Sequence, residues 1–415
     1  MTNDSVPPTA AAAGSGPEWE FAHSPDGEAQ SSSGADGPVA GGPAPEPAPD
    51  GTRLAYDGAA DAAIRIAVSN SLRTLATLGV YRFWAKTRVR RYLWSRVSFL
   101  GDRVEYTGTG RELLLGFIAA IVVLGLLGGS LFGLEIAFGI EHPVYWTAQG
   151  IYSVGIVFLV FVAEYRARRY RLSRTEWRGI RFAQGGSSLR YALLAVGWTV
   201  VTVLSLGTTY AVYRTSLQRY RTTHTSFGDR RFEFTGRAGE LLKTWLLAWV
   251  FFVPTLGLTW IWYRAREFRH FAAKSRWGSL SFSSDLETGA MYRIVVFFAV
   301  LTALVVGVLF AVIVALAVST VMLNPGLVES TQRAGAWLPF NPNAAELAGY
   351  VIAISVFLPV MAVLRMLFLI HPLFRDVLPS IGVIGEEDFE AVAQSAVSMP
   401  RRGEGLADAL DVGAV

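Results

Sequence analysis

Long apolar segments, separated by short polar and basic ones, make up most of the chain after its polar first fifty residues. Each apolar segment is close to the roughly 20 residues that cross a bilayer core as a helix. The expected spans are 112–136, 144–163, 189–213, 241–263, 291–320 and 347–370. This pattern predicts an all-α polytopic integral membrane protein with degenerate internal repeats and short cytoplasmic β segments.

A short apolar turn followed by a basic and aromatic helix recurs along the chain. Each turn reads Thr-Leu-Gly or Ser-Leu-Gly, and an aromatic or imidazole ring follows thirteen residues after its glycine. Glycine at such a point indicates the end or a break of a helix, with a functional hinge as the alternative. Short strands are expected between units, at sequences such as 103-RVEYT-107 and 231-RFEFT-235. The turn glycines are Gly79, Gly207 and Gly257.

The repeated pattern divides the chain into seven segments. Residues 1–52 are rich in Ala, Gly, Pro and Ser and lack the pattern of a signal peptide, so we expect a disordered cytoplasmic tail. The remaining segments are unit 1 at 53–111 (amphipathic helix, turn, basic arm), unit 2 at 112–190 (helix pair, basic arm), unit 3 at 191–236, unit 4 at 237–290, a C-terminal transmembrane pair at 291–372 and a cytoplasmic C-terminal tail at 373–415.

Composition supports the membrane interpretation and narrows the chemistry. Hydrophobic residues make up 52% of the chain and aromatic residues 13%, which is too apolar for an ordinary soluble protein with a polar tail. The chain has no cysteine, which excludes disulfides, thiolate nucleophiles and cysteine-ligated zinc. Its five histidines are scattered, and no metalloprotease, serine-hydrolase or phosphate-loop motif is present. We therefore expect no enzyme activity, no cofactor and no metal site.

Nearly all cations between the apolar segments are arginines, interleaved with aromatic rings. Guanidinium groups and rings at the end of an apolar helix suit the headgroup region, where they meet lipid phosphates. A general positive-inside bias is the alternative explanation, and nucleic acid is not an expected partner. The residues expected to bind anionic lipid headgroups or another anion are Arg88, Arg90, Arg91, Arg168, Arg169, Arg171, Arg219, Arg221, Arg266 and Arg269.

Three further features carry separate interpretations. Gly125, Gly129 and Gly133 fall on one helix face, where small residues allow close helix packing, within the chain or in a homo-oligomer. Arg365 lies near the end of an apolar segment, so it either reaches the interface or lines a pathway. Glu112 and Glu240 begin apolar helices, where capping is favoured over proton coupling.

The turns bear on topology. If 189–213 and 241–263 each crossed once, the basic arms would alternate sides, against the positive-inside preference. Breaking the second segment at 255-TLG-257 leaves 13 residues before the break, or about 20 Å of helix, which reaches only partway through the core. We therefore predict that each turn sends the chain back to the same side. Ordinary alternating spans are the alternative.

Several motifs resemble those of the YjgN-type family of bacterial inner-membrane proteins of unknown function. They are 56-YDG-58, 77-TLGVYRFWAKTRVRRY-92, 101-GDRVEYTGTGRELL-114, 221-RTTHTSFGDRRFEFTG-236 and 402-RGEGLADALDVGAV-415. The resemblance implies a multi-pass protein of the inner membrane and offers no established activity.

Two functional classes are compatible with these observations: transport or channel function is the expected one, because repeats and broken helices are common in transporters, and lipid binding is the alternative. A transport or channel protein would use the repeats to frame a cavity, as many transporters do. A protein that binds anionic lipid or acts as a membrane scaffold would use the arginine and aromatic arms, with no permeation path. Polar groups around a shared cavity would favour transport, and a packed apolar interior would favour lipid binding. The sequence does not identify a substrate.

Overall fold

Ten short strands pair in sequence order into one antiparallel sheet in the computed structural model of the chain, which describes residues 53–323, 344–397 and 400. Arg53 bridges to Gly382 in the last strand, so the sheet curls until its ends meet. We call these ten strands the strand ring. They are β1 (Ala55–Tyr56), β2 (Val97–Phe99), β3 (Asp102–Tyr106), β4 (Thr175–Trp177), β5 (Ile180–Gln184), β6 (Thr225–Phe227), β7 (Arg230–Phe234), β8 (Ser275–Trp277), β9 (Leu280–Ser284) and β10 (Ile381–Ile384).

The strand ring corrects the expected fold class. An all-α protein with only minor β segments is wrong, because a continuous ten-stranded sheet joins every part of the described chain. Each strand has only two to five residues, too few to show a clear alternation of polar and apolar side chains. Five of the nine strand pairs also join residues separated by a whole helix pair, for example Tyr106 with Thr175, so no local pattern marks them.

Helices occur as five successive pairs in the described chain, each inserted between two strands. The fifth pair ends in a π-helix and a short α-helix, and its central connection lies outside the described residues. The elements are α1 (Ala60–Ala76), α2 (Arg82–Ser95), α3 (Gly110–Phe138), α4 (Pro143–Ser173), α5 (Ser188–Leu204), α6 (Tyr210–Thr223), α7 (Ala238–Val250), α8 (Leu258–Ala273), α9 (Thr288–Leu323), α11 (Ala344–Arg365), η1 (Met366–Ile370) and α12 (His371–Val377).

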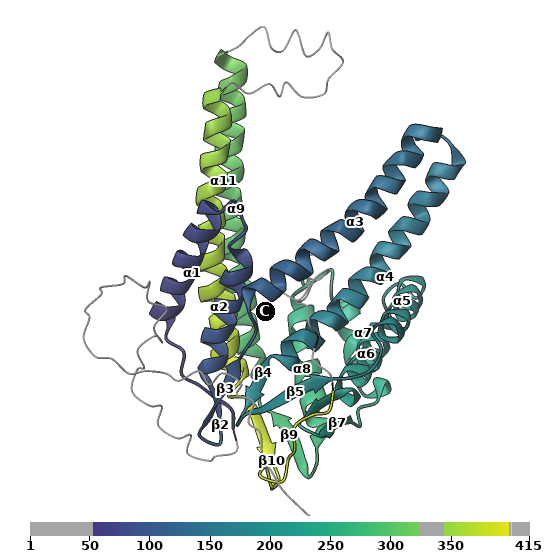
Figure 1. The fold of residues 1–415 in the computed structure, drawn as a ribbon, viewed down its shortest axis with the longest axis vertical. Helices are drawn as coiled ribbons and strands as arrows, with labels where there is room; N and C mark the ends of the chain where they lie inside the picture. The colour runs from purple at the N-terminus through teal and green to yellow at the C-terminus, as the bar shows by residue number, and fades with distance from the viewer. Residues whose placement is uncertain (1–52, 324–343, 398–399, 401–415) are drawn as a thin grey trace, which may run out of the picture. The chain divides into compact units, whose positions relative to one another are not determined.

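All five helix pairs leave the strand ring at the same end. Strands that are neighbours in the chain are joined alternately by a helix pair and by a two-residue turn, and every strand pairing is antiparallel. Helix pairs must then lie at one end of the ring and tight turns at the other. Figure 1 shows α3 beside α4 and α9 beside α11, leading away from the strands.

Four helical segments of the described chain are long and apolar enough to cross a membrane. They are Gly110–Phe138, Pro143–Ser173, Thr288–Ser319 and Leu347–Val377. Two of the six expected spans, 189–213 and 241–263, are instead interrupted, because a turn divides each into two shorter helices that pack against one another.

Each Thr- or Ser-Leu-Gly sequence ends one helix and begins the next. In the first copy, the Gly79 N–H donates to the Thr74 carbonyl at 2.7 Å, which closes the last turn of α1. The Thr77 hydroxyl then accepts the Tyr81 N–H at 2.9 Å before α2 begins. Leu78 and Gly79 both have positive φ, 49° and 90°. The same bond to the turn glycine, at 2.7 Å, closes α5 and α7.

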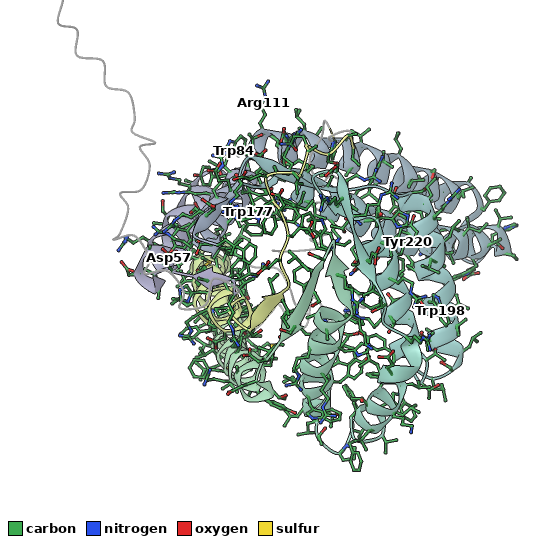
Figure 2. All side chains as sticks on the ribbon, turned by 90° about the horizontal axis from the view of Figure 1, so that it is seen from below. Asp57, Trp84, Arg111, Trp177, Trp198 and Tyr220 are labelled. Carbon is green, nitrogen blue, oxygen red and sulfur yellow. The ribbon has the colours of Figure 1, made fainter. Side chains whose placement is uncertain are left out.

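Aromatic and aliphatic side chains fill the strand ring. The centre includes Trp177, Phe227 and Trp277, all buried, and Figure 2 labels Trp177 in this region. Phe389, from the segment after β10, has its ring centroid 5.0 Å from that of Trp177 and 5.7 Å from that of Trp277. Residues 385–397, which we call the C-terminal segment, therefore contribute to the core of the ring. The expected tail at 1–52 and residues 401–415 lie outside the described residues.

Candidate functional site

Four of the arginines expected to bind lipid donate to backbone carbonyls of the next loop. Each lies near the end of the second helix of a pair, and its acceptor is 16 or 17 residues further along. The bonds are Arg91 Nη2 to Gly108 O at 2.9 Å, Arg169 Nη2 to Gly185 O at 2.8 Å, Arg219 Nη2 to Gly236 O at 2.7 Å and Arg269 Nη1 to Leu286 O at 2.8 Å. His371 Nε2, in the fifth pair, lies 2.9 Å from the Gly58 carbonyl. Neighbouring units are thus tied together around the ring.

Rings near the end of the second helix reach the start of the first helix in four pairs. Three of them form hydrogen bonds there: Tyr92 OH to Ala59 O at 2.8 Å, Tyr170 OH to Glu112 Oε2 at 2.6 Å and Tyr220 OH to Ser187 O at 2.9 Å. In the fourth, His270 Nε2 lies 3.7 Å from Glu240 Oε2, beyond hydrogen-bond distance. Burial lowers the pKa of His270, which favours the neutral imidazole.

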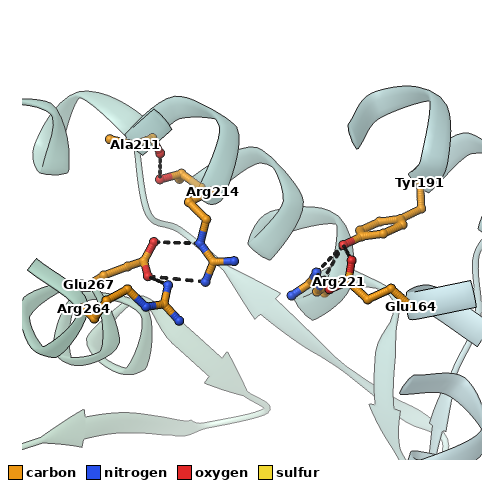
Figure 3. A network of polar contacts seen from close by, with 8 residues as sticks. Glu164, Tyr191, Ala211, Arg214, Arg221, Arg264 and Glu267 are labelled. Atoms are coloured by element: carbon orange, nitrogen blue, oxygen red, sulfur yellow. Dashed lines mark hydrogen bonds and ion pairs between the residues drawn. The ribbon is translucent and has the colours of Figure 1, made fainter. Parts of the chain in front are cut away.

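A buried carboxylate joins α6 and α8. Glu267 is only 2% exposed, and Arg214 Nε donates to its Oε1 at 3.0 Å. Arg264, one turn earlier on α8, donates to the other oxygen of Glu267 (Figure 3). Burial alone would lower the pKa of Arg214, but the paired carboxylate raises it overall. Two arginines on one buried carboxylate therefore form a stable charged link between the helices.

A second charged cluster joins α4, α5 and α6. Arg221 donates to Glu164 and to the Tyr191 hydroxyl, and the Tyr191 hydroxyl also donates to Glu164 at 3.3 Å (Figure 3). Every member is buried or half-buried. Ionisable groups in such a position are costly in a membrane unless they pair with each other, as they do here. Arg221, expected to bind lipid, also belongs to this cluster.

A cavity of about 690 Å³ lies between α1, α2 and the α11–η1 region. Most of its wall is apolar, and its polar lining includes Asn70, Lys86, Arg90 and Arg365. None of the described residues that line it is acidic. Ligand sites of proteins commonly have this size, an apolar wall and a few convergent polar groups. The cavity is therefore the candidate site for binding a molecule.

The remaining arginines expected at the headgroups have varied surroundings. Arg88 Nη1 donates to Ser69 Oγ at 3.3 Å, and Arg90 Nη1 donates to the Tyr106 hydroxyl at 3.2 Å. Arg168 and Arg171 are half-buried on α4. Arg266 is exposed and lies over the Trp262 ring at 4.2 Å.

The structure gives no close partner to the expected glycine packing face. A Cβ atom built on Gly125, Gly129 or Gly133 would meet nothing within 4 Å among the described residues. Glu112 forms a capping box with Thr109 at the start of α3, in agreement with a capping role.

Asn70, Lys86 and Ser355 line the cavity but were not selected from sequence. Asn70 and Lys86 lie on helices of the first pair and Ser355 lies on α11, far along the chain. One signal was available: Asn70, Ser71 and Thr74 are neutral polar residues that lie among apolar ones in the same helix. Polar side chains in such a helix commonly face the protein or a cavity.

Four helices of the described chain are long and apolar enough to cross a membrane, and they leave one end of a filled strand ring in pairs. The chain belongs to the family described as bacterial protein of unknown function (DUF898), whose profile matches residues 51–258. The resemblance noted in the sequence is thereby confirmed.

Curated relatives carry the name inner membrane protein YjgN. The relative from Salmonella typhimurium is 37% identical over 95 residues, covering 20% of this chain and 24% of its own length. The relative from Escherichia coli O157:H7 is 22% identical over 237 residues, covering 49% of this chain and 57% of its own length. The chain therefore spans at most about 57% of the length of these relatives. No solved structure matches the chain.

Proposed function

We propose that this chain is an inner-membrane protein that binds and organises anionic lipid at one face of the bilayer. The strand ring lies in water on the cytoplasmic side, two long helix pairs cross the bilayer, and three short pairs insert their turns into the near leaflet. The observation that carries the proposal is the set of three turn leucines. Leu78, Leu206 and Leu256 are 95%, 77% and 93% exposed.

The conformation of these leucines adds weight to the proposal. Each has a φ between 49° and 53°, a left-handed conformation that costs roughly 1–2 kcal/mol for a residue with a side chain. Glycine or asparagine would adopt it with less strain. A leucine that is strained and exposed in water gains nothing, whereas in lipid each leucine contributes about 1.5–3 kcal/mol from its transfer out of water.

The backbone of each turn is also suited to lipid. Unpaired N–H and C=O groups are costly in a bilayer, so a turn at that depth has to satisfy them internally. The Thr255 hydroxyl donates to the Phe251 carbonyl at 2.6 Å and accepts the Thr259 N–H at 3.3 Å. The threonine of the turn thus serves both helix ends. The 17 residues of α5 span about 25 Å, which is short of a complete crossing.

Labelling at the turns tests the insertion. The chain has no native cysteine, so Leu206→Cys and Leu256→Cys each offer a single thiol. In native membranes, we expect both thiols to react with an apolar, membrane-soluble maleimide and not with a charged one. The matched control is Thr223→Cys, near the ring end of the same helix pair as Leu206, which should react with the charged reagent. Fast reaction of both turn thiols with the charged maleimide would contradict leaflet insertion.

A transport function is the second candidate. It is supported by the interruption of α11, which contains Pro359 and continues into the π-helix η1 beside the cavity. Broken helices next to a cavity are a feature of transporters. A path through the centre of the strand ring is disfavoured by the packed rings of Trp177, Trp277 and Phe389. A transported solute would therefore pass along the α1, α2 and α11 cavity.

A further inference from the structure

We propose that the cavity between α1, α2 and α11 is a binding site for one anionic phospholipid, with the phosphate at the ring end and an acyl chain toward the turn of the first helix pair. This inference rests on the proposed lipid-binding function and deepens it by naming the site.

The two ends of the cavity differ in their lining. At the end nearest the turn it is lined by Leu75, Leu78 and Val351, together with Arg82, whose guanidinium lies over the Phe117 ring at 4.3 Å. At the opposite end it is lined by Arg90 and Arg365, with Met366 and Ile370 completing the wall. Residues 78 and 351 lie far from the strands along their helices, and residues 90 and 365 lie close to them. On α2 the step from residue 82 to residue 90 is about 12 Å of helix.

The order of apolar and cationic ends in the cavity matches the order of hydrocarbon and headgroups in a bilayer. If the helix pairs point into the membrane, the apolar end lies in the hydrocarbon region and the cationic end lies near the headgroups. A phospholipid could then bind with its phosphate still at the headgroup level and its acyl chain still in the hydrocarbon region. A soluble anion would use the cationic end and leave the apolar part of the cavity empty.

The cationic end is built for a phosphate. Arg90 is 1% exposed, and the Tyr106 hydroxyl accepts from its Nη1 at 3.2 Å, which fixes the guanidinium plane. Lys86 lies one turn before it on α2, and Arg365 approaches from α11. None of the described residues that line the cavity is acidic, so an anion at this end would lie beside the side chains of Lys86, Arg90 and Arg365.

Asn70 indicates a hydroxyl on the ligand. This side chain is 5% exposed and lines the cavity, and its Nδ2 donates to the Ala85 carbonyl at 3.2 Å. Its Oδ1 has no hydrogen-bond partner among the described residues. A buried acceptor left unpaired is destabilising, so a donor from the ligand would satisfy it. A phosphate with a hydroxylated headgroup, as in phosphatidylglycerol, offers both groups.

Native mass spectrometry of the full chain from phosphatidylglycerol nanodiscs tests the site. The double variant Lys86→Gln/Arg365→Gln removes two cations and leaves the buried Arg90 in place. We expect the fraction of chain that retains one phosphatidylglycerol to fall about tenfold or more, because charge-assisted hydrogen bonds are worth about 1.5–3 kcal/mol each. The matched control, Lys243→Gln/Arg190→Gln, removes the same two charge types at exposed positions outside the cavity and should retain lipid as the wild type does.

Two further arms identify the occupant. Ala362→Phe adds bulk to the apolar wall without changing the charge, and it should also reduce the retention of phosphatidylglycerol. A site that binds the headgroup alone would show no such reduction. Excess inorganic phosphate should not displace the lipid, and phosphatidylcholine should not replace it. Unchanged retention in Lys86→Gln/Arg365→Gln, in a variant whose thermal unfolding matches the wild type, would overturn the site. Displacement of the lipid by inorganic phosphate alone would also overturn the site. The same holds if a second copy of the chain is found in place of the lipid. Labelling of Leu206→Cys tests leaflet insertion without involving the cavity. The two proposals can therefore fail separately.

Discussion

At the scale of single residues, the recurring arginines and rings hold the units together. The sequence revealed their spacing and predicted lipid binding for Arg91, Arg169, Arg219 and Arg269, and the structure adds a bond from each to a backbone carbonyl. Their acceptors are loop carbonyls 16 or 17 residues away, a relation that depends on how a helix, a strand pair and a loop fold back together. The interval of 16 or 17 residues from each arginine to the loop after the next strand pair is visible in the sequence and could have predicted these bonds.

Arg219 offers a test of this structural role. Replacement by Gln removes the charged donor to the Gly236 carbonyl and should destabilise the fold by about 1.5–3 kcal/mol, seen as a lower Tm in detergent. Arg266→Gln, at an exposed arginine that stacks on Trp262, should change Tm much less. Loss of bound lipid in Arg219→Gln with an unchanged Tm would instead support the headgroup role inferred from sequence.

A glycine two residues after an aromatic ring also has a clear local cause. A Cβ atom at Gly108 would come within 2.6 Å of the Tyr106 hydroxyl oxygen, because that ring folds back over the loop. Gly236 has the same relation to Phe234. We expect Gly236→Ala to lower Tm through this clash, and Gly239→Ala, at a glycine with open space around it, to have little effect. Equal Tm values for the two variants would contradict this explanation.

At the scale of elements, apolar helices and turns were predictable and strand pairing was not. Long apolar runs indicated all four helices that could cross a membrane, and the turn sequence indicated the breaks after α1, α5 and α7. The sequence did not predict the continuous sheet, because each strand is short and because pairs such as β9 with β10 join distant parts of the chain. The cavity was not predictable for the same reason, since α11 reaches α1 only after the ring closes.

The C-terminal segment should respond to acid. Ser279 donates its backbone N–H and its hydroxyl to Glu387, and Arg230 pairs with it, so the pKa of this carboxyl is lowered from its usual value. A carboxyl whose pKa is lower in the folded state favours the attached segment above its unfolded pKa of about 4.3. That contribution is lost as the pH falls through the folded pKa.

Hydrogen exchange across residues 385–397 measures this effect. At neutral pH, we expect Glu387→Gln to exchange faster than the wild type in this segment, because the neutral amide cannot replace the charged contacts. Below the folded pKa, the two proteins should become alike. Glu390→Gln, at an exposed carboxyl, serves as the control and should exchange like the wild type. Equal exchange of Glu387→Gln and the wild type at neutral pH would exclude this anchoring role.

At the scale of the whole molecule, one rule of connection determines how the chain can meet a membrane. Because every helix pair leaves the same end of the strand ring, each pair has to return to the side from which it started. Alternating single spans at 189–213 and 241–263 would pull neighbouring strands to opposite sides of the bilayer and break the pairings of β5 with β6 and of β7 with β8. The account therefore requires the ring and all the basic arms to lie on one side.

Sidedness of single cysteines in intact cells tests this requirement most directly. Thr223→Cys and Ser275→Cys lie where the third and fourth helix pairs return to the ring, and Glu141→Cys lies in the connection between α3 and α4. With a charged maleimide that does not cross the membrane, we expect Glu141→Cys to be labelled from the periplasm, and Thr223→Cys and Ser275→Cys only after the cytoplasmic face is opened. Periplasmic labelling of Thr223→Cys, with Ser275→Cys still protected, would contradict the one-sided arrangement and establish alternating spans.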